Sequence, residues 1–158
     1  MEVLAALKAS AFCQWVLADP YAVQLLLCAH SVGMGVVVGI VLVLNVRVLG
    51  YARNMPIGIF HQALTIAWWG FILNALSGVV LFATNGPNLI TLWTFQWKMI
   101  FILAGGLSVW LLWRTAKNHG EAGHQFSTNE KIIAGVSALF WLTAIAFGRY
   151  IAYTIAPG

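Results

Sequence analysis

Four long runs of apolar residues, separated by shorter polar stretches, dominate the pattern along the chain. They cover about residues 20–49, 61–83, 97–115 and 131–155. At about 1.5 Å of rise per residue, roughly 20 apolar residues in a helix cross the hydrocarbon core of a bilayer. The pattern therefore predicts an all-α fold: an integral membrane four-helix bundle forming a single transmembrane domain over residues 1–158.

Residues at the ends of the runs carry helix-start and helix-stop signals. Asp19 can cap a helix that begins near Pro20, and Gly50 can end that helix. We expect the second run to close at the turn-forming sequence Thr-Asn-Gly-Pro of residues 84–87. Residues 1–19 are too short to span, and we expect them to form a helical segment at the membrane interface.

Composition supports the membrane class and excludes several others. The chain is 61% hydrophobic and 8% charged, whereas soluble domains carry about 25% charged residues. A soluble enzyme, a nucleic-acid binder and a disordered protein are therefore excluded. Cys13 and Cys28 form no Cys-x-x-Cys-His motif, so covalent c-type haem is not expected.

Basic residues predict the orientation of the chain. They gather beside the 50–60 and 116–130 connections, at Arg47, Arg53, Arg114, Lys117 and Lys131. Only Lys8 and Lys98 flank the other side. The positive-inside rule then places both connections in the cytoplasm and both termini outside.

Small residues recur every fourth position in three of the runs and predict helix-packing seams. These residues are Ser31, Gly35 and Gly39, then Gly70, Asn74 and Gly78, then Ala144, Gly148 and Ala152. Small side chains let helix backbones approach closely. The seams also make a homo-oligomer one of the expected assemblies.

Ionisable side chains inside the predicted spans are the candidate functional residues, because burial in lipid is costly. His30 is 10 residues in from Pro20, roughly 15 Å by helix rise, and Arg149 is roughly 9 Å from Ile155. Lys98 opens the third span on the same side as Arg149. No acidic residue lies within the predicted limits of the four spans, so an anionic ligand group would balance these cations. Haem propionate is the foremost candidate, ahead of a quinone or lipid headgroup, with snorkelling to lipid phosphates as the alternative.

His30 is the candidate axial ligand of a b-type haem. It shares a helix face with Gly33 and Met34, and the glycine would leave a recess for a porphyrin edge. The second ligand would be Met99 on another helix, Met34 or water, or the iron would have no second ligand. The alternative is a histidine that hydrogen-bonds a neighbouring helix.

The cytoplasmic side holds the remaining histidines. His61 opens the second span, and His119 and His124 follow in the polar connection, with Arg47 nearby. A second haem or a transition metal, ligated by His61 and either loop histidine, is the functional interpretation. Simple solvation of the loop histidines is the alternative.

Five short motifs follow one another in order along residues 20–155. They are Ala-His-Ser-Val-Gly at 29–33, Asn-Val-Arg-Val-Leu-Gly at 45–50, Ser-Gly-Val-Val-Leu-Phe at 77–82, Phe-Gln-Trp-Lys at 95–98 and Gly-Arg-Tyr-Ile-Ala-Tyr at 148–153. Together they resemble a bacterial family of small four-helix membrane proteins of unknown function. That family is distantly similar to the membrane domain of copper-resistance protein D.

The resemblance implies a multi-pass protein of the bacterial inner membrane, with His30, Lys98 and Arg149 at motif positions. Members of the family often carry a histidine in the third helix, whereas Ser108–Trp113 of this chain contains none. A haem held by histidines of the first and third helices is therefore not expected here.

Two classes of function follow from these residues. The first is a b-type haem-binding electron-transfer protein or subunit that exchanges electrons with a quinone or an outer-side partner, more a subunit than a stand-alone enzyme. The second is a non-redox anchor or assembly subunit of a larger complex, or a copper-handling protein that uses Met34, Met99 and Cys28 as soft donors. Expected partners are the lipid bilayer and a membrane or periplasmic protein or a second copy of the chain, and no nucleic acid.

Overall fold

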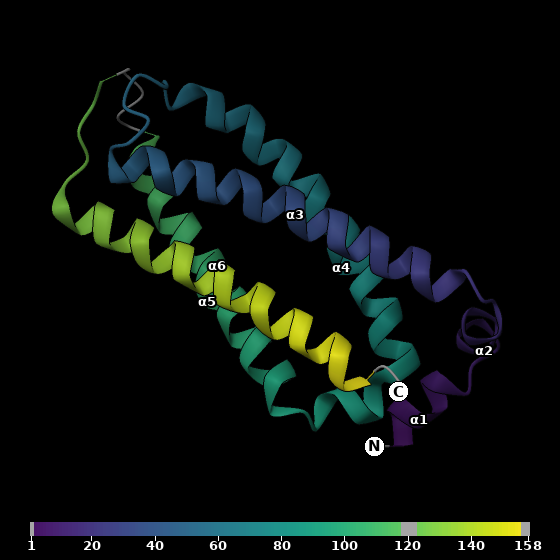
Figure 1. Ribbon diagram of the computed structural model, residues 1–158. Helices are drawn as coiled ribbons and strands as arrows, with labels where there is room; N and C mark the ends of the chain where they lie inside the picture. The colour runs from purple at the N-terminus through teal and green to yellow at the C-terminus, as the bar shows by residue number, and fades with distance from the viewer. Residues whose placement is uncertain (1, 118–122, 156–158) are drawn as a thin grey trace. The chain divides into compact units, whose positions relative to one another are not determined.

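The computed structural model describes residues 2–117 and 123–155, and this part of the chain is built from α-helices (Figure 1). The helices are α1 (Glu2–Lys8), α2 (Ala11–Ala18), α3 (Ala22–Leu49), α4 (Gly58–Ile90), α5 (Trp93–Ala116) and α6 (Thr128–Ile155). Four of them, α3 to α6, are long and apolar enough to cross a membrane. The all-α prediction with four spans is confirmed, and the chain is a multi-pass membrane protein.

Both signals at the ends of α3 act as the sequence predicts. The Asp19 carboxylate Oδ1 accepts hydrogen bonds from the backbone N–H of Tyr21 at 2.8 Å and of Ala22 at 3.0 Å, which satisfies unpaired donors of the first turn. Gly50 has a φ of 101°, a left-handed conformation that only glycine adopts without strain. The helix ends there.

The second span is longer than predicted. Helix α4 continues through residues 84–87 to Ile90, so the prediction of a closing turn there is wrong. Thr84 is fully buried, and its hydroxyl donates to the Leu81 carbonyl at 3.0 Å. The polar group is thus satisfied within the helix, and membrane helices tolerate glycine and proline that would end a soluble helix.

The fourth span begins earlier than predicted, at Thr128. Glu130 Oε2 accepts from the Ser127 N–H and the Ser127 hydroxyl, both at 2.8 Å, and Ser127 Oγ accepts from the Glu130 N–H at 3.4 Å. This capping box follows the pattern Ser-x-x-Glu and fixes the start of α6. Glu130 therefore lies in the first turn of α6.

The predicted interfacial segment consists of two short helices, α1 and α2. Ser10 caps α2 by accepting from the Cys13 N–H at 3.3 Å. Cys13 and Val16 are buried, whereas Phe12 and Trp15 are 56% and 61% exposed. Helix α2 thus has one face packed within the protein and an aromatic face directed outward.

The described residues pack as two compact units. The first comprises Met1–Val37 and Ile66–Trp93, and the second comprises Val38–Thr65 and Thr94–Gly158. The second unit holds a cluster of buried apolar residues on α3, α4, α5, α6 and the intervening loops. These residues are Leu44, Val48, Ile57, Phe60, Leu112, Phe126 and Ala134.

Within the first unit, α3 packs on the predicted seam of α4. The α3 residues at this contact differ from those that the sequence predicted. A Cβ added at Gly33 would lie 2.6 Å from the Gly70 carbonyl oxygen and 2.7 Å from the Asn74 nitrogen, so the two backbones touch. A Cβ added at Gly35 or Gly39 would meet nothing within 4 Å. The α4 seam is confirmed, but the predicted Gly35–Gly39 seam of α3 is wrong, because the contacting face passes through Gly33.

The predicted α6 seam packs at two of its three positions. Ala144 is 1% exposed, and Gly148 lies against the side chain of Lys98. The side chain of Ala152 lies outside the described residues.

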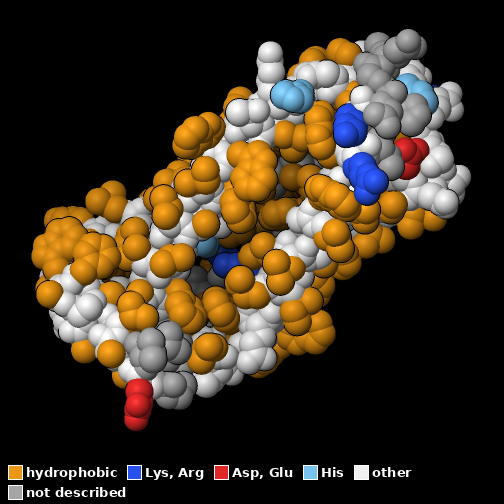
Figure 2. Space-filling view, turned by 180° about the vertical axis from the view of Figure 1, so that it is seen from behind, with side chains coloured by type: hydrophobic (Ala, Val, Ile, Leu, Met, Phe, Trp, Pro, Cys, Tyr) orange, Lys and Arg blue, Asp and Glu red, His pale blue; other side chains and the backbone are white. Residues whose placement is uncertain are grey.

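Apolar side chains also cover much of the outer surface. Figure 2 shows hydrophobic side chains over most of the visible face, with few charged side chains among them. Large side chains of α4, such as Trp68, Trp69 and Leu76, are more than 60% exposed. A surface of this kind is stable in lipid, which confirms the bilayer as the environment of the chain.

Candidate functional site

His30 lies at a polar contact between α3 and α4 in the first unit. Its ring Nδ1 is 2.9 Å from the backbone carbonyl oxygen of Asn74, and the Asn74 side-chain amide donates to the His30 carbonyl at 2.7 Å. The two residues therefore hydrogen-bond reciprocally across the helices. Such bonds between membrane helices stabilise by about 0.6 kcal/mol each on average.

The neighbours of His30 fix its tautomer. A carbonyl oxygen only accepts, so Nδ1 carries the proton and donates to Asn74. Ser77 Oγ lies 3.3 Å from the same ring nitrogen, and its own proton goes to the Leu73 carbonyl at 2.7 Å. The ring nitrogen with the lone pair is then Nε2, which is the arrangement that a backbone carbonyl imposes on metal-ligating histidines.

Glycine at position 78 makes room for the imidazole. A Cβ added at Gly78 would lie 3.0 Å from His30 Cε1 and 3.3 Å from Nδ1. An alanine there would force the ring to shift by a few tenths of an ångström. The sequence indicated Asn74 as a packing residue and as a polar group within a span, and it placed Ser77 and Gly78 in the motif at 77–82. It did not predict that these residues surround His30.

Gly33 has a different environment from the one expected. The space beside it, predicted to receive a porphyrin edge, is filled by the backbone of α4 at Gly70 and Asn74. Gly33 allows α3 and α4 to approach closely enough for His30 to reach Asn74. It acts on the site through packing.

Lys98 lies against Gly148, the residue before Arg149, at one end of the second unit, where α5 begins and α6 ends. The Lys98 Cε and Nζ atoms lie 3.4 Å from the position of a Cβ added at Gly148, the residue before Arg149. The Arg149 guanidinium lies over the Tyr153 ring, 5.4 Å from its centroid. The structure thus brings the two predicted cations to neighbouring positions. Met99, the predicted second ligand, is 42% exposed on α5.

Arg47 has a structural environment at the opposite end of the second unit. It is 0% exposed, and its Nε donates to the Met55 carbonyl at 2.7 Å. Its Nη1 donates to the His124 carbonyl at 3.2 Å, and its guanidinium lies 5.4 Å from the Phe126 ring centroid. One buried cation therefore ties two connecting segments to the end of α3.

The histidines on this side lie against separate aromatic rings. His61 is exposed and lies 6.0 Å from Trp113 by ring centroids, whereas His124 meets the edge of Phe126 at 5.1 Å. His119 lies outside the described residues. Among residues 2–117 and 123–155, no group of three or more His, Cys, Asp or Glu side chains could hold a metal ion.

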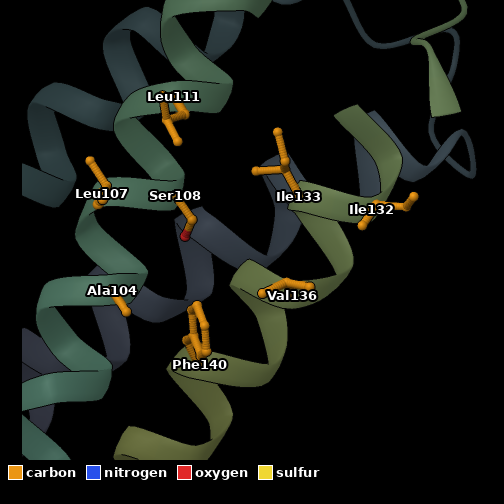
Figure 3. Close-up of a pocket in the computed structure, with 8 residues that line it drawn as sticks. All are labelled: Ala104, Leu107, Ser108, Leu111, Ile132, Ile133, Val136 and Phe140. Carbon is orange, nitrogen blue, oxygen red and sulfur yellow. The ribbon is translucent and has the colours of Figure 1, made fainter. Parts of the chain in front are cut away.

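An apolar groove of about 270 Å³ separates part of α5 from α6 in the second unit (Figure 3). Among the described residues that line it, Ser108 is the polar one, and its hydroxyl donates to the Gly105 carbonyl at 2.7 Å. The remaining lining residues are Ala104, Leu107, Leu111, Ile132, Ile133, Val136 and Phe140. The groove offers no polar group for catalysis or for orienting a polar ligand.

A scan against protein-family models, a search of curated proteins and a search of solved structures found no match to this chain. The resemblance to small four-helix bacterial membrane proteins therefore stays a prediction from the motifs.

Proposed function

We propose that the protein is a b-type haem-binding electron-transfer protein, or a subunit of one, in the bacterial inner membrane, exchanging electrons with a quinone or an outer-side partner. The observation that carries the proposal is the hydrogen bond from His30 Nδ1 to the Asn74 carbonyl. It orients the imidazole and favours the tautomer in which Nε2 would ligate a haem iron. A bound haem would supply one-electron redox chemistry at its iron.

The protein's own residues would act on the haem by positioning. His30 would ligate through Nε2, while the Asn74 carbonyl and Ser77 hydroxyl hold the ring. Gly78 and Gly33 would keep α3 and α4 close enough for that hydrogen bond. The proposal requires neither Lys98 nor Arg149.

The test is the absorption spectrum of the full chain, purified in detergent from haem-replete cells, before and after dithionite reduction. We expect a reduced α-band in the wild type and in His61→Ala, which removes an exposed histidine of the second unit. His30→Ala should abolish the band. A colourless wild-type protein would overturn the proposal.

A second candidate, a non-redox anchor or assembly subunit, is favoured by the reciprocal His30–Asn74 bonds, which explain His30 by packing alone. Two variants separate the candidates. Asn74→Ala removes the side-chain bond but keeps the backbone carbonyl, so a haem ligand should survive it. His30→Gln keeps a hydrogen-bond donor and removes the imidazole. Pigment retained in the first variant and lost in the second supports the haem, whereas a stoichiometric colourless partner complex supports the anchor.

A further inference from the structure

Two positive side chains from different helices lie at one end of the second unit. Lys98 is in the second turn of α5, and its ammonium lies against Gly148 of α6. Arg149 is the next residue of α6. Gly148 matters here because a larger side chain would occupy the space that the end of the lysine fills. The contact places two like charges on neighbouring positions near the end of the spans.

Among the described residues of the second unit, the acidic side chain lies far from both cations. Glu130, the acidic side chain described in the second unit, is at the other end of α6, roughly 28 Å from Arg149 by helix rise. The Arg149 guanidinium lies over the Tyr153 ring, 5.4 Å from its centroid. Two adjacent cations in a low-dielectric setting repel, so an anion between them lowers the free energy of the site.

Aromatic side chains show at which depth the cations lie. Trp93 and Trp97 on α5 are 59% and 48% exposed, and Tyr150 and Tyr153 on α6 are 54% and 70% exposed. Exposed tryptophan and tyrosine gather at the level of the lipid headgroups. Lys98 directly follows Trp97 and Arg149 directly precedes Tyr150, so both cations lie next to this aromatic level, where lipid phosphates are found.

The spacing of α5 and α6 at this level is held by a ring stack. Phe101 and Phe147 have ring centroids 5.7 Å apart and planes at 13°. Phe101 is one turn from Lys98, and Phe147 is two residues from Arg149. The stack therefore joins the two helices close to the positions of the two cations.

We propose that Lys98 and Arg149 together bind the phosphate of an anionic phospholipid of the phosphatidylglycerol type. The arginine fork can grip two phosphate oxygens while the lysine adds a point charge. A choline headgroup would bring its own positive charge against this pair, so the site selects against zwitterionic lipid. The lipid chains lie along the apolar outer faces of α5 and α6. The inference stands independently of the haem.

The test is competitive lipid retention by native mass spectrometry. The full chain in detergent receives equal amounts of dioleoyl phosphatidylglycerol and dioleoyl phosphatidylcholine. We expect preferential retention of the glycerol lipid by the wild type, and a loss of roughly tenfold or more in Lys98→Gln and in Arg149→Gln, as for one charge-assisted hydrogen bond. Arg114→Gln is the matched control, because Arg114 lies over Trp110 at 5.5 Å but at the other end of α5.

Charge-preserving variants keep the test decisive if a neutral variant does not fold. Lys98→Arg and Arg149→Lys retain the two charges, so both should keep most of the selectivity. Equal retention of the two lipids, or an equal loss in Arg114→Gln, overturns the proposal. A shifted haem α-band in Lys98→Gln with unchanged lipid retention would also overturn the proposal. That result would identify a haem propionate as the anion. A colourless protein that still selects the glycerol lipid contradicts the haem proposal alone.

Discussion

Substitution of Gly33 by alanine should separate α3 from α4. The added Cβ would lie 2.6 Å from the Gly70 carbonyl oxygen and 2.9 Å from the Asn74 Cβ, so backbone as well as side chain must move. Overpacking of this kind costs about 1–3 kcal/mol. The shift also breaks the two His30–Asn74 hydrogen bonds, at about 0.6 kcal/mol each. We therefore expect Gly33→Ala to lower the free energy of unfolding by about 2–4 kcal/mol.

Gly35→Ala is the matched control, because it makes the same change two residues along the same helix. A Cβ there meets nothing within 4 Å, and alanine favours a helix over glycine by up to about 1 kcal/mol. Unfolding by SDS in mixed micelles, followed by tryptophan fluorescence, gives both free energies. If Gly33→Ala is as stable as Gly35→Ala, the close approach of the two backbones at Gly33 is refuted.

Two further changes test the ends of the helices. Arg47→Lys keeps the buried charge, but a lysine cannot donate to both the Met55 and His124 carbonyls. The free energy of unfolding should therefore fall by about 2–3 kcal/mol in the same assay. Arg53→Lys, at an exposed position, should change it little. An unchanged midpoint for Arg47→Lys would contradict the clamp. Glu130→Ala removes the capping box and should speed exchange of the Ser127 amide roughly fivefold, as for a cap of about 1 kcal/mol, measured by NMR in micelles. Unaltered exchange would show that the cap is not formed.

The number of spans was predictable because it depends on the length of apolar runs, which local composition determines. Helix ends were predictable only where one residue carries the signal. Asp19 and Gly50 do so, and both act as expected. The end of α4 was not predictable, because the helix continues through a glycine and a proline that would end most soluble helices.

Packing faces were harder to predict than spans. Gly33 and Gly35 differ by two positions on one helix, and both fit a rule that small residues mark contacts. Which of the two glycines makes the contact depends on the partner helix, and it follows from the position at which His30 bonds to Asn74. The role of Arg47 was likewise hidden, since its acceptors are backbone carbonyls that any residue at 55 or 124 would present.

The Arg47 clamp has a consequence for the order in which the chain is made. Its first acceptor, the Met55 carbonyl, is 8 residues away, whereas the His124 carbonyl is 77 residues away. At about 5–20 residues per second, the ribosome adds the second acceptor roughly 4–15 seconds after Arg47 itself. Asn74, the partner of His30 at a separation of 44 residues, is added within that interval and before His124. The residues that join α3 to α4 are thus synthesised before the second acceptor of the arginine, which follows only after α5.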